Sequence, residues 1–595
     1  MAKSDNEGNS KYINLLGLAV LLVCYVGAIW NVVKAKRQEE RADVIRIVHW
    51  QLELGVRDGL QAMIDKFEIY KAEQGQAVEV VQIPIPERAY NQYVTTQLIG
   101  GTAPDMIQIG FFPMEYLGRY FYPLSNEIQK PNPFIAERIV ELSQKESLTE
   151  AEEAESEYLD ILVDKPWMDT FRDGLRGQFR PDFQEYFGVG FSTFTVRMYY
   201  NKNLFKKVLG HDRAPSSFEE LIDFSNQIVA YGEKENITLL PIASSKYQAR
   251  VFRYLYLGEI TSDLAREYDM DYNGVADGSE KLMAMLRGDL TPWNEQYAAS
   301  IDVVQELADF FPRGFMSMGR EDSGFAFVQG EAGMITSGSW DAMSYLKKIQ
   351  DQPEESRFEV GIFDLPPISK THPKYGAFAD GRRSEAAAGT GFGFGITRFT
   401  RNFDLCVEFL QFSTTPQHNT ELNEIAKWIP VVHGSVPSGF LKNFEPNSVG
   451  YSGDASFAVM TGGKVTLLED QVYWPLISGD STFETYANDL WNKLPPEAAT
   501  DYKRMYQGST ESIPNRQARR TAYLANVVFG DQDPAARTAA EIQLQRSLQP
   551  LMQFQTSQKT LDRKMEITLE QIPDDEKIQE FNQNFFKALE REMSQ

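Results

Sequence analysis

FAFVQGEAGMITSGSW, residues 325–340, is the stretch from which the fold can be predicted most directly. Its first half ends at Gly330, which is typical of a helix C-terminus, and residues 333–336 predict a short apolar strand. Gly338 follows that strand, and its lack of a side chain lets another group approach the backbone closely. Trp340 then stands at the strand's end, where open α/β sheets bind their ligands. Trp340 is therefore either part of a binding surface or a core aromatic that covers the end of a sheet.

The residues before this stretch predict alternating strands and helices. Strands are expected at 44–50, 78–83 and 105–109, and helices at 57–71 and 89–99. In the first helix, Leu60, Ile64 and Phe67 share one face, as an amphipathic helix requires. The order strand, helix, strand, helix, strand predicts a parallel, doubly wound sheet, which places the chain in the α/β class.

Further segments of recognisable pattern follow one another along the chain. They are GTAPD (101–105), YYNKNLF (199–205), APSSFEEL (214–221), FEVGIFDLPP (358–367), GTGFGFGI (389–396), DLCVEFLQF (404–412) and WIPV (428–431). YYNKNLF predicts a strand that ends at Tyr200 and a turn at Asn201. Ser216 or Ser217 is then expected to cap a helix with acidic residues in its first turn, where the helix dipole favours negative charge.

Most of these segments, together with residues 325–340, resemble the signatures of the extracellular solute-binding proteins of ABC sugar importers (family 1, maltose-binding-like), and they occur in the same order. The resemblance runs from Val44 to about Leu494, and Ser217 and Phe218 replace the threonine and tryptophan that are usual there. It implies a two-lobed periplasmic-binding-protein fold of type II. Lobe 1 is expected to comprise residues 44–165 and 366–435, and lobe 2 to comprise residues 166–365 and 436–500.

Composition and charge exclude several classes of function. A chain of 595 residues is too long for one core and predicts two or more domains. The formal charge of -25 argues against nucleic-acid binding, which needs clustered basic residues. The two cysteines, Cys24 and Cys406, predict no disulfide framework. The histidines show no metal-ligand spacing such as HExxH, so a zinc enzyme is not expected; they are His49, His211, His372, His418 and His433.

An apolar segment at residues 12–33 follows a short N-terminal tail at 1–11. About 20 such residues span a bilayer as a helix, and the apolar residues continue beyond Cys24, unlike those of a cleaved signal. We expect an uncleaved transmembrane anchor, then a linker at 34–43. The basic residues after the anchor outnumber those before it. By the positive-inside rule, this favours an orientation with the large C-terminal part of the chain in the cytoplasm. The family resemblance nevertheless implies an extracytoplasmic, periplasmic domain on a single-pass protein of the inner membrane.

The C-terminal part, residues 501–595, exceeds the usual length of this family and predicts a helical extension. Asp533 and Pro534 have the pattern of a cap followed by a first-turn proline. A second, amphipathic helix is expected from Asp574, with an apolar face formed by Ile578, Phe581, Phe585 and Leu589. The extension either packs on lobe 2 or docks a partner.

Residues 269–280 match the D-x-[DN]-x-[DN]-G-x5-E pattern of a calcium-binding loop. The expected ligands are side-chain oxygens and one carbonyl, from Asp269, Asp271, Asn273, Val275, Asp277 and Glu280. Ala276 replaces the branched apolar residue that usually pairs two such loops, so a paired EF-hand is not expected. One structural Ca²⁺ ion is the candidate cofactor. The alternative is an acidic turn between two helices.

The predicted function is capture of a carbohydrate between two lobes for delivery to the permease subunits of an ABC importer. From their positions after the family's strands, the expected ligand-binding residues are Trp340, Asp341, Trp50, Glu53, Phe111, Phe112, Tyr247, Arg250, Trp428 and Trp474. Each of these aromatic residues has a core position as its alternative. No catalytic residue is expected. The alternative functions are a polysaccharide-acting enzyme with two carboxylates, and a sugar sensor or scaffold that uses the same fold.

Overall fold

The computed structural model describes residues 43–594, apart from 53–54, 111–113, 181–182, 184, 380–383, 386–389, 436, 438, 448, 452, 461, 511 and 531–532. The predicted tail and transmembrane anchor, with residues 34–42 of the linker, lie outside these described residues. Among the residues that are described, no helix combines the length and the apolar character needed to cross a membrane.

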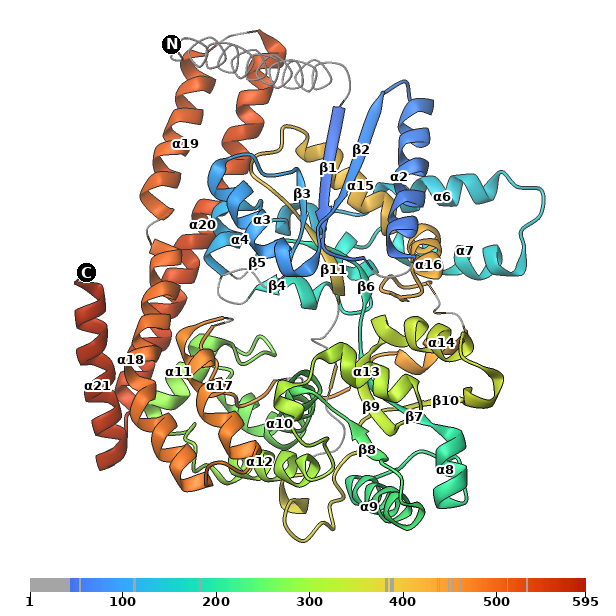
Figure 1. Ribbon diagram of the computed structural model, residues 1–595. Coiled ribbons are helices and arrows are strands. Elements are labelled where there is room, and N and C mark those ends of the chain that lie inside the picture. Colours follow the sequence, from blue (N-terminus) through green and yellow to red (C-terminus); the bar gives the residue numbers. More distant parts are fainter. Residues whose placement is uncertain are drawn as a thin grey trace, which may run out of the picture.

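Two α/β lobes form the body of the molecule, the upper and lower halves of Figure 1. Lobe 1 holds a six-stranded sheet in the order β12-β6-β11-β3-β1-β2. β1 pairs in parallel with β2 and β3, whereas β11 runs antiparallel to β3 and β6. The predicted strand and helix order at 44–109 is confirmed. The strands are β1 (Asp43–His49), β2 (Val78–Pro84), β3 (Met106–Gln108), β6 (Val189–Thr193), β11 (Thr390–Ile396) and β12 (Ile429–Pro430).

Lobe 2 holds a four-stranded sheet in the order β10-β7-β9-β8. Its strands are β7 (Val196–Asn201), β8 (Leu240–Ala243), β9 (Ala332–Gly338) and β10 (Val360–Phe363). Every residue of β9 is buried, and the strand pairs in parallel with β8 and antiparallel with β7. The strand predicted at residues 333–336 is thus a central strand of this sheet. Gly330, with a φ of 77°, separates it from the preceding helix, as expected.

The crossovers between the lobes fall at other positions than predicted. Only Phe194 and Thr195 separate β6 of lobe 1 from β7 of lobe 2. The predicted boundary at residue 166 would have placed β6 in lobe 2. The chain returns to the first sheet at β11, whereas residues such as Ile368 and Tyr375 are still buried in the core of lobe 2. The strands of each sheet pair residues that are far apart in sequence. The local signatures therefore could not locate the positions at which the chain crosses between the lobes.

Helices cover both sheets. Around lobe 1 they are α2 (Val56–Glu73), α3 (Glu87–Gly100), α4 (Met114–Tyr120), α5 (Ser125–Ile128), α6 (Pro133–Ser143), α7 (Glu150–Leu162), α15 (Phe403–Ser413) and α16 (Pro416–Ala426). Around lobe 2 they are α8 (Lys202–Leu209), α9 (Phe218–Glu235), α10 (Lys246–Tyr268), α11 (Gly278–Arg287), α12 (Glu295–Ala308), α13 (Arg320–Val328) and α14 (Ala342–Gln350). A small sheet joins β4 (Phe179–Arg180) to β5 (Glu185–Tyr186). α9 begins as predicted, because the Ser217 hydroxyl accepts a hydrogen bond from the Glu220 N–H.

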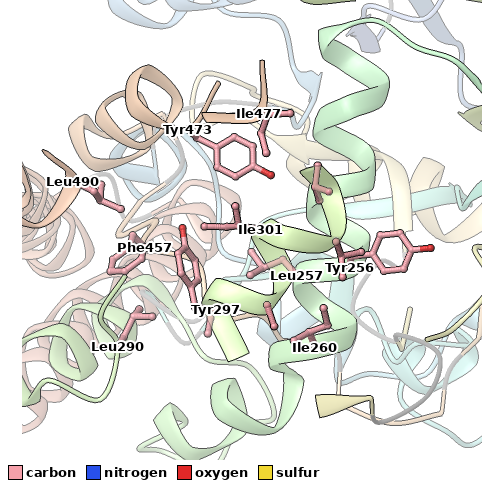
Figure 2. Packing of buried hydrophobic residues seen from close by; sticks show 14 of the residues in the cluster. Tyr256, Leu257, Ile260, Leu290, Tyr297, Ile301, Phe457, Tyr473, Ile477 and Leu490 are labelled. Atoms are coloured by element: carbon pink, nitrogen blue, oxygen red, sulfur yellow. The ribbon is translucent and has the colours of Figure 1, made fainter. Parts of the chain in front are cut away.

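The core of lobe 2 combines the aromatic packing shown in Figure 2 with a buried polar network. Tyr297 packs edge-to-face against Phe457, with 5.0 Å between ring centroids. Its hydroxyl donates to Glu469 at 3.0 Å and contacts the Tyr486 hydroxyl at 2.6 Å. Arg253 forms an ion pair with Glu469, so the buried carboxylate has a counter-charge. Tyr486 and Glu469 belong to C-terminal helices, and these helices are therefore an integral part of lobe 2.

The C-terminal helices are α17 (Lys464–Ile477), α18 (Phe483–Thr510), α19 (Ser512–Phe529), α20 (Pro534–Gln571) and α21 (Glu576–Met593). α20 begins at Pro534 and α21 has Asp575 as its N-cap, close to the predicted starts. α21 packs on lobe 2 through Phe581 and Phe585, which agrees with the first of the two expected alternatives for this part of the extension. α19 and α20 run together along one side of lobe 1 (Figure 1).

Removal of the Phe581 ring should destabilise lobe 2 strongly. Phe581 is 2% exposed and stacks on Trp491 with 4.3 Å between ring centroids. Phe581→Ala leaves a cavity in this interface and is expected to lower the free energy of unfolding by about 3–5 kcal/mol. Phe529→Ala is the matched control, because Phe529 is 85% exposed, and it should change stability by less than about 0.5 kcal/mol. Denaturant titration measures both. Equal stabilities of the two variants would contradict the packing of α21.

Candidate functional site

Trp340 lies directly after β9, with its indole across Gly338. A Cβ atom at Gly338 would lie 2.3 Å from the indole carbons, so the ring occupies the space that a side chain would need. The ring of Phe194, from the crossover between the lobes, meets it edge-to-face at 5.8 Å. Trp340 is only half-buried. The glycine therefore has the role that the sequence predicted, which is to admit a close neighbour at the strand's end.

Arg320, at the start of α13, links three of the predicted residues. Its guanidinium donates to the Asp341 carboxylate at 2.6 Å. The same guanidinium lies 4.9 Å from the ring centroid of Tyr247 and 5.7 Å from that of Trp340. The Ser337 hydroxyl also donates to Asp341, at 2.5 Å. Trp340, Asp341 and Tyr247 thus form one cluster around a charged group.

The two lobes approach each other near Tyr247. Burial raises the pKa of the Tyr247 hydroxyl, while the Arg320 charge opposes this and the carboxylates of Asp341 and Glu87 add to it. Glu87 begins α3 of lobe 1, whereas Tyr247 and the rest of the cluster belong to lobe 2. The electrostatic environment of Tyr247 is therefore set by both lobes.

Trp50 has the corresponding position in lobe 1. It follows β1, and its indole lies across Gly110, where a Cβ atom would come within 2.6 Å of the ring. Its backbone N–H donates to the Gln108 side chain at 3.1 Å, and its ring meets Tyr90 at 4.8 Å. Each lobe therefore has a half-buried tryptophan lying over a glycine that follows a central strand.

Other predicted residues lie apart from this cluster or outside the description. Glu53, Phe111 and Phe112 are outside the described residues. Arg250 pairs with Asp470 of α17 on the surface between α10 and α17.

Trp428 and Trp474 occupy core positions. Trp428 is 2% exposed and packs edge-to-face on Phe194 and Phe392, at 4.6 and 5.2 Å. Trp474 is 3% exposed and packs against Tyr473. Burial of this extent agrees with the core alternative for both indoles. Trp428 has no exposed face for a ligand in this structure, whereas Trp474 still borders a pocket.

A pocket of about 1110 Å³ lies within lobe 2, between α12, the end of α17 and residues 311–316. Trp474 is among its lining residues, whereas Trp340, Asp341 and Tyr247 are not. Two of its carboxylates have partners in the lining: Lys374 lies 2.8 Å from Asp302, and the Tyr375 hydroxyl donates to Glu306 at 3.3 Å. The pocket is therefore separate from the cluster around Arg320.

The calcium-like loop connects α10 to α11. Carboxylate oxygens of Asp269, Asp271 and Glu280 come within 4.8 Å of one another, a donor set that suits a hard cation. Asp277 caps α11, and Asn273 and Val275 interact within the loop, where the Val275 N–H donates to the Asn273 side chain at 2.9 Å. The ammonium of Lys564 in α20 also reaches the carboxylates of Asp271, Asp277 and Glu280. Calcium binding stays a prediction.

Sequence reasoning missed Arg320, Gly110 and Lys564. Arg320 is the basic residue of an otherwise acidic first helical turn, Arg320-Glu321-Asp322. As an indication of a site residue, this pattern is weaker than the strand pattern that follows it. Gly110 follows the strand that GTAPD introduces and could have been found by analogy with Gly338. Lys564 lies 284 residues after Glu280, and no local pattern connects the two.

The chain belongs to the bacterial extracellular solute-binding protein family, whose model matches residues 62–445. The resemblance stated from the sequence is thereby confirmed. No curated protein sequence matches the chain.

Several solved structures share its fold at low identity. A chitin oligosaccharide binding protein is 15% identical over 78% of this chain and 99% of that chain, with a TM-score of 0.49. The solute-binding protein RafE in complex with raffinose is 14% identical over 75% and 97%, with a TM-score of 0.48. Maltose-bound MalE3 of T. maritima is 15% identical over 76% and 98%, with a TM-score of 0.48. Because these TM-scores are below 0.5, the ligands of those proteins are not assigned to this chain.

His49, the residue before Trp50, should make the free energy of unfolding depend on pH. His49 is fully buried, and burial lowers the pKa of its imidazole from 6.5 to about 4. Between these values the unfolded chain binds more protons than the native state, so the free energy of unfolding falls as the pH is lowered from 6.5 to 4. The full effect is about 3 kcal/mol.

His49→Gln, which cannot be protonated, should remove this part of the pH dependence. Denaturant unfolding at pH 7.5, 5.5 and 4 measures it in both proteins. If the two proteins lose stability in parallel as the pH falls, the imidazole is not the group responsible.

Proposed function

We propose that the protein captures a carbohydrate between its two lobes and delivers it to the permease subunits of an ABC importer. Membership of the extracellular solute-binding family supports a binding function outside the cytoplasm. The observation that carries the ligand class is the pair of half-buried tryptophans, Trp50 and Trp340, one at the carboxyl end of a central strand in each lobe.

The chemistry of this cluster suits a sugar. A pyranose ring has apolar C–H faces that pack on an indole, and a rim of hydroxyl groups that need hydrogen-bonding partners. Arg320 and Asp341 supply such partners beside Trp340, and each hydrogen bond to a charged group contributes about 1.5–3 kcal/mol. Two stacked rings with several such bonds reach about -8 kcal/mol, a micromolar dissociation constant, after the cost of ordering both partners.

Ligand binding would couple to closure of the lobes. A sugar that touches Trp50 and Trp340 together gains the full set of contacts only when both lobes are close, so it shifts the population toward that state. The short crossover at Phe194 and Thr195 is the natural place for the rotation, because few residues there need to change their backbone angles.

The N-terminal apolar segment would hold this binding domain at the membrane. Residues 12–33 have the length and composition of a spanning helix, and the linker at 34–43 leads directly into β1. The proposed location is the outer face of the cytoplasmic membrane, where a tethered receptor stays near its permease.

Loss of either tryptophan should weaken sugar binding without unfolding the protein. A thermal-shift screen over a glycan library identifies a ligand, and isothermal titration calorimetry then gives its affinity. Trp340→Ala and Trp50→Ala are each expected to weaken binding at least about 10-fold, or about 1.4 kcal/mol. On α10, Tyr247→Ala should also weaken binding, whereas Tyr254→Ala, at an exposed position on the same helix, should not. Wild-type affinity in both tryptophan variants would exclude this site.

The same ligand distinguishes a receptor from an enzyme. A binding protein returns the glycan unchanged after long incubation, and chromatography of the glycan detects any cleavage. If cleavage products form with purified wild-type protein and do not form without it, the protein is a hydrolase rather than a receptor.

Deletion of residues 1–42 should release the protein from membranes. The full chain is expected to sediment with the membrane fraction and to resist extraction by high salt, because an apolar helix is held by its burial in lipid rather than by charge. The truncated chain should remain in the supernatant. Sedimentation of both forms with the membranes would show that another part of the chain makes the attachment.

A further inference from the structure

The loop between α10 and α11 concentrates negative charge in a buried place. The carboxylates at positions 1, 3, 9 and 12 of its calcium-binding pattern belong to Asp269, Asp271, Asp277 and Glu280. Asp269 is 6% exposed, Asp277 is 8% exposed and Glu280 is fully buried. Carboxylates removed from water in this way need a cation close by, since an unpaired buried charge costs several kcal/mol.

Lys564 supplies that cation. It comes from α20 and is only 5% exposed. Its ammonium lies 3.2 Å from the Asp271 carboxylate, 3.0 Å from that of Asp277 and 3.1 Å from that of Glu280. Burial alone would lower the pKa of this ammonium, but the three carboxylates raise it above its ordinary value, so the group is charged at neutral pH.

The position of the ammonium is incompatible with a metal ion in the same loop. Ca²⁺ takes six to eight oxygen ligands at about 2.3–2.6 Å. Three of the loop's four carboxylates already contact the lysine, which would stand within a few ångströms of the metal and repel it. The residues of the loop fit calcium in type and spacing, but the Lys564 ammonium occupies the position that the metal would need.

The rest of α20 explains why the lysine stays there. Leu561 and Thr568, one turn on either side of Lys564, are buried on the same face of the helix. Leu561 belongs to the core of lobe 2, and the Lys564 ammonium is also within 3.4 Å of the Ser279 hydroxyl in the first turn of α11. The acidic loop is thus a docking site for α20.

We propose that Lys564 is the resident cation of this calcium-like loop, and that a divalent cation occupies the loop only when the Lys564 ammonium is absent from it. The metal and the C-terminal helix then compete for one set of oxygen atoms. The loop accepts a divalent cation of the calcium class, and its normal occupant is a side chain of the same protein.

Calcium titration of the full chain tests the proposal. Four proteins are treated with chelator and compared: wild type, Lys564→Met, the double variant Lys564→Met with Glu280→Gln, and Lys559→Met. Lys559→Met is the matched control, because Lys559 is an exposed lysine of the same helix. Calorimetry should show Ca²⁺ binding to Lys564→Met with a dissociation constant of about 10⁻³ M or tighter, at least about 100-fold tighter than to wild type. Lys559→Met should behave as wild type, and Glu280→Gln should abolish the binding that Lys564→Met creates.

Thermal unfolding gives a second readout. Calcium should raise the melting temperature of Lys564→Met and leave that of wild type and Lys564→Arg unchanged, because arginine keeps the positive charge. If Lys564→Met does not fold without metal, calcium should restore its folded circular dichroism. Equal calcium affinities of wild type and Lys564→Met would overturn the proposal, and so would a Lys564→Met protein that neither binds calcium nor folds in its presence.

Discussion

The link between β6 and β7 sets the geometry of the whole molecule. Thr193 pairs with β11 and β12 of lobe 1, and three residues later Val196 pairs with Gly338 of lobe 2. The Ser339 N–H donates to the Thr195 carbonyl at 2.9 Å, which ties the end of β9 to the link itself. Because only two residues connect the strands, the ends of the two sheets must lie close together. This link brings Phe194 and Trp340 into contact at that junction.

Local features of the chain could be predicted well from sequence. The alternating strands and helices at 44–109, the cap of α9 at Ser217, the strand before Gly338 and the start of α20 at Pro534 all depend on residues within a few positions of one another. Helix caps, glycine turns and apolar periodicity act over that range, so a single sequence contains enough information. The close approach of an aromatic ring to Gly338 belongs to the same group, since glycine and tryptophan are two residues apart.

Features that depend on distant residues could not be predicted in this way. β6 joins lobe 1 because it pairs with β11, about 200 residues later. Trp428 was predicted as a binding residue together with Trp340, but Phe194 and Phe392 enclose it, and neither is near it in the chain. The calcium-like loop shows the limit most clearly. Its twelve residues match a metal site, and whether a metal can enter depends on a lysine near the other end of the chain.

The C-terminal helices touch both lobes, and this changes how the molecule can move. Lys564 and Phe581 fix them to lobe 2, while Arg516 donates to the Gly118 carbonyl of α4 and Ile513 packs beside it on lobe 1. These contacts lie to one side of the β6–β7 link. A change in the angle between the lobes would have to break or rearrange these contacts, so its free energy would include their loss. The resting angle of the two lobes is thus set partly by residues that never meet the ligand.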